Sequence, residues 1–227
     1  MTSAKPFGDI QQASIMVIGH DPRLQKSKAE AEYAFFLDYL LHQRPSRAGE
    51  ARKYDLAQAL VNYISELAGR EIPLQTLYVT NLCNEFLPST YGRGTVLIPD
   101  GQAERGVAYI CQAISEGQFR LILPLSLQVT YHLARVNFFD GAVDDVLTFV
   151  HQARPVPGKA AQGVYTPVGT TPFLAMCGKR LYHLGVPVVP VLHVKQWPLR
   201  DHMRRYKGSM QNASQEIRQL LGGSEDV

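Results

Sequence analysis

The side chains best suited to chemistry in this 227-residue chain come at the ends of apolar runs. His20 and Asp21 follow one run, Asn81 ends a second, and His193 ends a third. An acid, an amide and an imidazole that meet at one place form a candidate functional site. Their spacing fits no metal-ligand motif, so we expect a site that works without a metal.

Apolar runs that end at turn residues are typical of strands buried on both faces of a parallel sheet. The carboxyl ends of parallel strands meet at one edge, where open α/β sheets bind ligands. The polar residues that follow the runs are therefore expected to lie together. Two prolines in the last run favour a strand near the sheet edge or an irregular ladder. The four predicted strands are residues 14–18, 76–80, 119–123 and 186–192.

The segments between these strands carry apolar residues at helical spacing. Strands that alternate with helices predict a three-layer α/β/α fold around a central four-stranded parallel sheet. We expect residues 1–227 to form a single domain, with residues 1–12 loosely ordered. The predicted helices are residues 28–41, 54–68, 102–115, 140–152, 173–184 and 201–221, and one more that runs from the turn at 124–126 to about Ala134.

Composition narrows the class of protein. Hydrophobic residues make up 45% of the chain and charged residues 19%, as in ordinary globular domains. The net charge of +3 permits a polyanion as partner without requiring one. Three cysteines without a C-x-x-C pair offer no disulfide framework, and residues 1–10 carry no apolar signal segment, so a cytoplasmic location is expected. No apolar run approaches the length of a membrane span, so we predict no membrane partner.

Three motifs together resemble the uracil-DNA glycosylase superfamily. Residues 19–22 (Gly-His-Asp-Pro) resemble its Gly-Gln-Asp-Pro turn. Residues 78–82 (Tyr-Val-Thr-Asn-Leu) resemble its strand that ends in a base-reading asparagine. Residues 191–193 (Val-Leu-His), followed by 197–199 (Trp-Pro-Leu), stand where the family has its catalytic histidine and its DNA-inserting loop. Order, approximate spacing and the α/β pattern agree from about residue 14 to residue 221.

The resemblance implies a uracil-DNA glycosylase-like fold and a DNA-repair hydrolase that excises uracil or a related damaged base. Asp21 would orient a water molecule or stabilise positive charge on the sugar, and Asn81 would bind the imide edge of uracil. His193 would hydrogen-bond the base as it leaves with negative charge. Of Tyr33, Phe35 and Phe36, Phe35 is the aromatic residue expected to stack on the base, and His20 is expected either to line the pocket or to lie at the surface.

The resemblance also implies contacts with DNA. Lys195, Arg204 and Arg205 are expected to bind phosphates, and Ser126 either binds a phosphate or caps a helix. Trp197 or Leu199 is expected to act as the wedge that enters the duplex. Branches of the family with an iron–sulfur cluster need four cysteines, so no cluster, no metal and no other cofactor is expected.

The chain departs from the family at two points that bear on its substrate. The glutamine of the first motif is His20 here, and Arg23 and Leu24 replace a Tyr-His pair whose tyrosine excludes thymine in the best-known branch. Two alternatives therefore stay open: a catalytically altered member that binds a nucleobase or DNA, and an enzyme that acts on a small nucleoside or phosphate compound. Each candidate also has a structural interpretation, because Asp21 can form a turn and a buried Asn81 can bond loop backbone.

Overall fold

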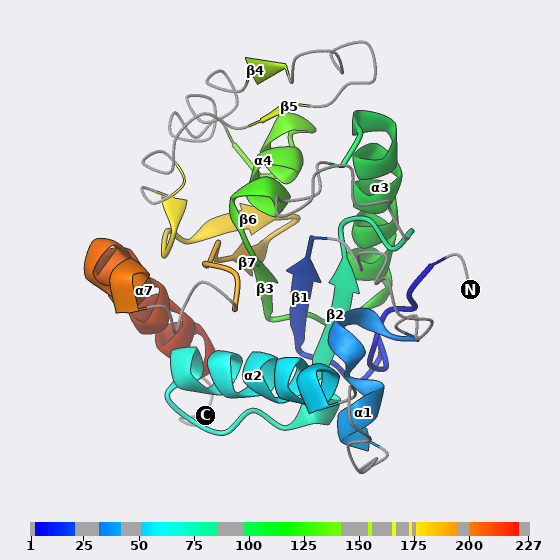
Figure 1. Ribbon diagram of the computed structural model, residues 1–227. Coiled ribbons are helices and arrows are strands. Elements are labelled where there is room, and N and C mark those ends of the chain that lie inside the picture. Colours follow the sequence, from blue (N-terminus) through cyan, green and yellow to red (C-terminus); the bar gives the residue numbers. More distant parts are fainter. Residues whose placement is uncertain are drawn as a thin grey trace.

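The computed structural model describes residues 3–20, 32–41, 51–85, 98–141, 154–155, 165–166, 173, 176–194 and 200–222 (Figure 1). For residues 51–52, 154–155, 165–166 and 200–206 it describes the backbone alone.

A five-stranded, mostly parallel sheet forms the centre of the protein, in the order β2-β1-β3-β7-β6. Strands β2, β1, β3 and β7 run parallel, and β6 pairs antiparallel to β7 at the edge. The sheet therefore has one strand more than the four that the sequence predicted. The strands are β1 (Ile15–Gly19), β2 (Leu77–Asn81), β3 (Leu121–Pro124), β6 (Leu181–His183) and β7 (Val186–Val188).

The additional strand β6 lies where the sequence predicted a helix over residues 173–184, and that prediction is wrong for residues 181–184. Leu184 and Gly185 both have positive φ, 49° and 78°, as in the two-residue turns that match the twist of a hairpin. β6 alternates buried, exposed, buried, with Tyr182 on the outside. Three residues are too few for a strand period to stand out from a helical one.

The ladder between β3 and β7 is short, as the two prolines indicated. Only Ile122 and Val188 are paired in register, and an isolated bridge joins Leu125 to Val191 further along. The backbone N–H of Val191 still donates to the carbonyl oxygen of Pro124 at 3.1 Å. The chain after β7 therefore stays beside the end of β3 and carries His193 to the same edge of the sheet.

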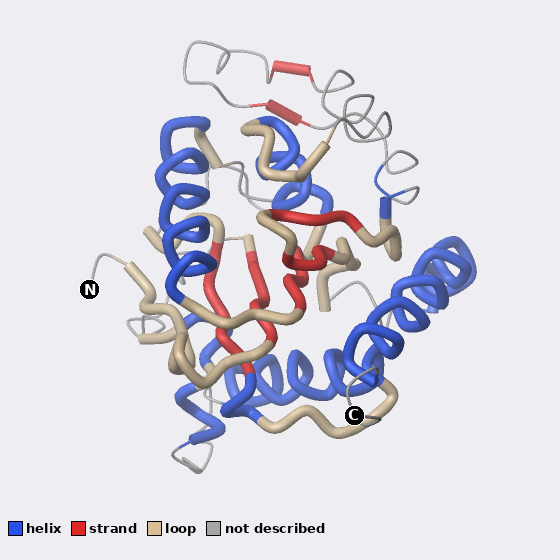
Figure 2. Tube along the Cα trace, turned by 180° about the vertical axis from the view of Figure 1, so that it is seen from behind, coloured by secondary structure: helices blue, strands red, loops and turns tan. Residues whose placement is uncertain are grey.

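Helices cover the sheet in an arrangement compatible with three α/β/α layers. α2 packs against α1 and α7, and α3 packs against α4. Figures 1 and 2 show α2 beside α7 and α3 along the β2 side of the sheet, where the hydroxyls of Tyr78 and Tyr109 meet at 2.8 Å. A separate antiparallel pair joins β4 (Arg154–Pro155) and β5 (Tyr165–Thr166). The helices are η1 (Ala34–Phe36), α1 (Asp38–Leu41), α2 (Ala51–Ala68), η2 (Leu74–Thr76), α3 (Asp100–Glu116), α4 (Leu127–Arg135) and α7 (Arg200–Gly222).

The predicted helices at 54–68, 102–115 and 201–221 are confirmed with small changes at their ends. Gly69 has φ 68° and follows α2, so it ends the helix as a left-handed C-cap. The helix predicted over residues 28–41 is wrong for residues 32–37, since α1 begins at Asp38. Residues 140–141 form a bend, and the rest of the helix predicted at 140–152 lies outside the described residues.

The N-terminal segment is not loosely ordered over residues 3–12, contrary to the prediction. Phe7 is buried and exchanges two backbone hydrogen bonds of 2.8 Å with Val79 of β2. Bridges also join Ser3 to Glu85 and Lys5 to Tyr33. The segment thus covers the outer edge of β2, which would otherwise present unpaired backbone groups.

Across the described parts of the chain, no helix has the length and apolar character needed to span a membrane.

Candidate functional site

The first two strands end in register at the proposed site. Gly19 of β1 pairs with Asn81 of β2. Beyond this pair, the N–H of Leu82 donates to the carbonyl oxygen of Gly19 at 2.8 Å, and that of Cys83 donates to His20 at 3.1 Å. The ends of β1 and β2, two of the four predicted strand ends, therefore lie together as expected. Asp21, the predicted catalytic acid, lies outside the described residues.

Asn81 directs its side-chain amide across Gly19. Its Oδ1 lies 2.5 Å from the position that a Cβ on Gly19 would take. The amide that bonds the backbone of this turn is a different one, because Asn84 Oδ1 accepts the N–H of Asn81 at 3.3 Å. Asn84 also donates to Thr80 Oγ1 at 3.2 Å. The alternative that Asn81 serves only to bond the loop backbone is therefore less apt, because the side chain of Asn84 makes that bond.

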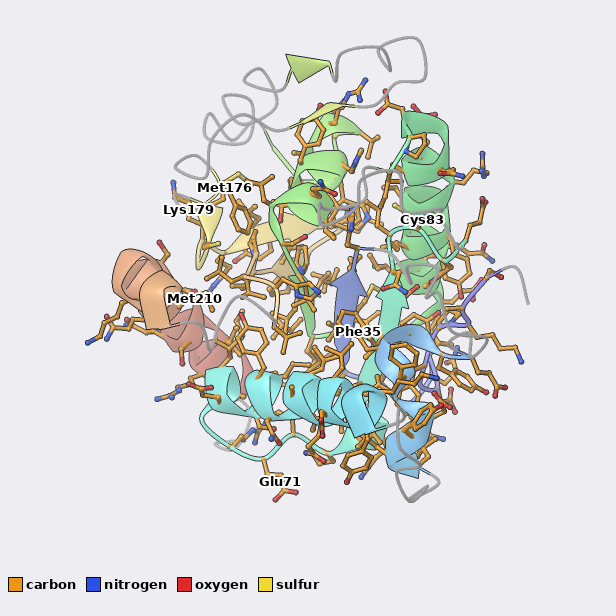
Figure 3. The ribbon with its side chains drawn as sticks, viewed as in Figure 1. Phe35, Glu71, Cys83, Met176, Lys179 and Met210 are labelled. Carbon is orange, nitrogen blue, oxygen red and sulfur yellow. The ribbon has the colours of Figure 1, made fainter. Side chains whose placement is uncertain are left out.

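Gly19 is required by the close approach of an aromatic ring. A Cβ at this position would lie 2.3 Å from Cε2 of Phe35. Figure 3 labels Phe35 in front of β1 and β2, where η1 contacts both β2 and α2. Any side chain at residue 19 would push the ring of Phe35 away from the strand ends.

Phe35 has an unfavourable backbone conformation. Its φ is 56° and its ψ is 17°, and Phe36 follows with φ 57°. Left-handed conformations cost about 1–2 kcal/mol per residue with a Cβ, so two bulky residues in succession need support from their surroundings. This kink delays the start of the α-helix to Asp38 and places the Phe35 ring at the strand ends.

His193 brings an imidazole to the same ring. Its ring stacks on that of Phe35 with centroids 5.9 Å apart and an interplanar angle of 28°. The residue before it, Leu192, accepts a hydrogen bond of 2.8 Å from the Tyr63 hydroxyl. Gly19, Phe35, Asn81 and His193 are together called the strand-end cluster below.

His20 is buried and lies near a second imidazole, His132 of α4. Burial is the main reason that the pKa of His132 is lowered to about 3, and electrostatic interactions with His20 and Arg135 lower it further. His132 is therefore neutral under ordinary conditions. The sequence predicted the helix that carries His132. It could not predict that His132 lies near His20, because the two residues are more than a hundred positions apart in the chain.

Ser126 takes the N-cap position of α4 with φ 103°, but its side chain makes no capping hydrogen bond. The capping interpretation of this residue is therefore wrong. Its carbonyl oxygen accepts both the N–H and the Oγ1–H of Thr130, at 3.1 and 2.9 Å. Its own N–H donates to Val191 at 2.9 Å, so the turn ties β3 to the segment that carries His193.

The other residues predicted to contact DNA are described only in part or not at all. Lys195 and Trp197 lie outside the described residues. Arg204 and Arg205 belong to the first turns of α7, for which the backbone alone is described. Among the residues with described side chains, no group of three or more His, Cys, Asp or Glu is placed to hold a metal ion.

The strand-end cluster offers an aromatic face, an amide that can both donate and accept, and an imidazole. Such a set can bind a planar, hydrogen-bonding ring and stabilise charge that develops on it. No protein-family model matches the chain, and a search of curated proteins found no match.

Proposed function

We propose that this protein is a uracil-DNA glycosylase-like enzyme that hydrolyses the N-glycosidic bond of uracil or a related damaged base in DNA. The observation that carries the proposal is that Phe35 and Asn81 both approach Gly19 while His193 stacks on Phe35. These are three of the residues to which the family resemblance gives a role in base binding or catalysis. Their sequence separation is large, so the meeting does not follow from local structure.

In this proposal the target base is flipped out of the DNA and enters the strand-end cluster, as in other enzymes that modify or remove a base. Phe35 stacks on the base and Asn81 binds its imide edge. His193 donates a hydrogen bond to the oxygen that gains charge as the glycosidic bond breaks. Asp21 directly follows His20 and would orient the attacking water, so no cofactor is needed.

One feature of the geometry sets a condition on binding. At 5.9 Å between centroids, the rings of Phe35 and His193 are in direct contact, and no base fits between them. A base that stacks on this face of Phe35 must therefore displace the His193 ring. The displaced imidazole would then lie at the edge of the base, where a hydrogen bond to its oxygen is possible.

The experiment is an abasic-site assay on single- and double-stranded oligonucleotides that contain uracil, hypoxanthine, xanthine or hydroxymethyluracil. The wild type is expected to create abasic sites on at least one of them, and Asp21→Asn is expected to lose most of the activity. Asp55→Asn, an exposed aspartate on α2, is the matched control and should behave as wild type. Full activity of Asp21→Asn would show that the role given to this carboxylate is wrong.

A second candidate is a family-like protein that binds DNA or a nucleobase without excision. The contact between His193 and Phe35 favours it, since this contact covers the face on which a base would stack. DNA binding that weakens with salt, without base release on any of the four substrates, would support this candidate. Phosphate contacts by Lys195, Arg204 and Arg205, with Trp197 as the wedge, belong to both candidates.

A further inference from the structure

We propose that Lys53 and Tyr63 of α2 are positioning residues that set the Phe35–His193 stack from two sides. Lys53 acts on Phe35 through Phe36, and Tyr63 acts on His193 through Leu192. Only the consequences for base excision rest on the proposed function. The position of the two rings can be tested without DNA.

Lys53 lies in a buried aromatic clamp formed with Phe36 and Tyr39. Only 5% of Lys53 is exposed, and its Nζ is 5.5 Å from the centroid of each ring. The ammonium also donates to the Tyr39 hydroxyl at 3.3 Å. Desolvation of an ammonium costs several kcal/mol, whereas a methionine would fill the same space at little cost. A desolvated cation–π contact is worth about 2 kcal/mol, so the two rings supply part of the compensation for the buried ammonium.

The clamp explains why a strained kink persists at the neighbouring residue. Phe36 packs with Tyr39 and Leu56 in a small cluster of its own, while Phe35 packs against the main core. Adjacent side chains on a helix diverge by only about 100°, so a sharper turn of the backbone is one way to face the two phenylalanines into separate clusters. The left-handed conformations at both residues make this turn. By fixing Phe36, Lys53 keeps the backbone in this conformation and holds the Phe35 ring over Gly19.

Tyr63 fixes the other ring at its backbone. Its side chain is 3% exposed, and its hydroxyl donates to the carbonyl oxygen of Leu192 across 129 residues of sequence. Leu192 is the last residue before His193, and it follows the isolated bridge at Val191. The hydrogen bond therefore holds the backbone at the point where the His193 side chain begins.

Both residues belong to one helix, so their separation is fixed. Ten residues separate Lys53 from Tyr63, which is about 15 Å along an α-helix. α2 is itself held by η1, α1 and α7. A site supported by a rigid element is more accurately arranged than one supported by loops, and here a single helix sets the backbone of both rings.

The central test measures the chemical shifts of the His193 ring protons by NMR, because the ring current of Phe35 displaces them. Phe35→Leu gives the value without the stack. We expect Lys53→Met and Tyr63→Phe each to move the His193 resonances by about half or more of the way to that value, as residues coupled through one contact do. Lys53→Arg keeps a cation over the rings and should restore the wild-type value. Lys207→Met and Tyr78→Phe are the controls and should leave the resonances unchanged.

Wild-type His193 resonances in both Lys53→Met and Tyr63→Phe would overturn the proposal, even if the variants were less stable. If Lys53→Met does not fold, Tyr39→Phe removes only the hydroxyl of the clamp and should give a smaller shift in the same direction. No shift in Tyr39→Phe would then count against the role of Lys53.

A kinetic test separates this inference from the proposed function. If the wild type excises a base, Lys53→Met is expected to lower kcat about 10-fold with wild-type Phe35 and to add no further loss in Phe35→Leu. An additive loss would contradict the role of Lys53. If the wild type excises none of the four bases, the proposed function fails, while the NMR result still decides whether α2 positions the two rings.

Discussion

Two histidines in the described part of the chain stack on phenylalanines, and the two stacks differ in spacing, tilt and exposure. His183 lies against Phe138 with centroids 3.8 Å apart and an interplanar angle of 7°. His193 lies against Phe35 at 5.9 Å and 28°. His183 is buried, whereas His193 is partly exposed.

The nitrogens of His183 are both engaged within the protein. Its Nδ1–H donates to the carbonyl oxygen of Phe138, the same residue on which the ring stacks. Its Nε2 is then the acceptor and lies 3.6 Å from Sγ of Cys111. A ring fixed by its face and by both nitrogens is a structural histidine. The His193 stack is looser and lies at the strand ends, as expected of a site that must accept a ligand.

Removal of the two imidazoles should give the largest and most clearly opposite effects. His193→Ala is expected to slow uracil release about 100- to 1000-fold, because a donor to developing charge is lost, with little change in stability. His183→Ala should lower the free energy of unfolding by about 2–4 kcal/mol and leave the rate per folded molecule unchanged. Single-turnover assays and urea denaturation measure both. Equal effects on activity from the two variants would remove the distinction between the stacks.

A methyl group added near each stack should distinguish a steric clash with the ring from backbone strain at a positive φ. In Gly19→Ala the new Cβ would meet the Phe35 ring at 2.3 Å, so we expect a loss of about 1–3 kcal/mol and a displaced ring. Gly185→Ala, in the hairpin of His183, meets nothing within 4 Å but has φ 78°, and should cost about 1–2 kcal/mol by strain alone. NMR of the His193 ring protons should change only in Gly19→Ala. An unchanged spectrum in that variant would contradict the contact between Phe35 and Gly19.

A third histidine, His132, should make the free energy of unfolding depend on pH. Its pKa in the folded protein is lowered to about 3 by burial and by His20 and Arg135. The unfolded chain has an ordinary histidine pKa of about 6.5 and so binds more protons between these values. Stability is therefore full above pH 6.5 and decreases as the pH falls, by about 2 kcal/mol between pH 6.5 and 5. Urea denaturation of the wild type and His132→Asn measures this, and an identical pH dependence in both would show that His132 is not the cause.

The smallest effect is expected at the thiol beside His183. Cys111 makes a weak hydrogen bond to Nε2, and burial raises the pKa of its thiol, so it acts as a neutral donor. Cys111→Ala should lower the free energy of unfolding by about 0.5–1 kcal/mol and leave base release unchanged. A loss of base release in this variant would mean that the structural stack also takes part in function.

The sequence predicted the part of the site that depends on strands. Apolar runs predicted β1 and β2, and their parallel arrangement predicted that His20 and Asn81 would lie side by side. Strong periodicity also predicted α2 and α7. These features are local, since each run or stripe contains its own signal.

The rest of the site depends on contacts between distant residues. Apolar residues at helical spacing predicted a helix through Phe35, but Gly19 and the clamp around Phe36 hold a left-handed kink there. The bond from Tyr63 to Leu192 joins residues 129 positions apart, and neither residue type indicates it. Backbone pairing of residues 3–7 was missed because polar side chains say nothing about main-chain hydrogen bonds at a sheet edge.

Release of free uracil under single-turnover conditions, from an oligonucleotide with one uracil, tests the central claim most directly. The proposed function predicts release by the wild type and a rate about 100-fold lower in Asn81→Ala, because the amide that binds the imide edge is lost. Asn84→Ala, which changes the turn amide beside it, should stay within about 10-fold of wild type. Release of uracil by Asn81→Ala at the full rate, or no release by the wild type of uracil, hypoxanthine, xanthine or hydroxymethyluracil, would contradict the account.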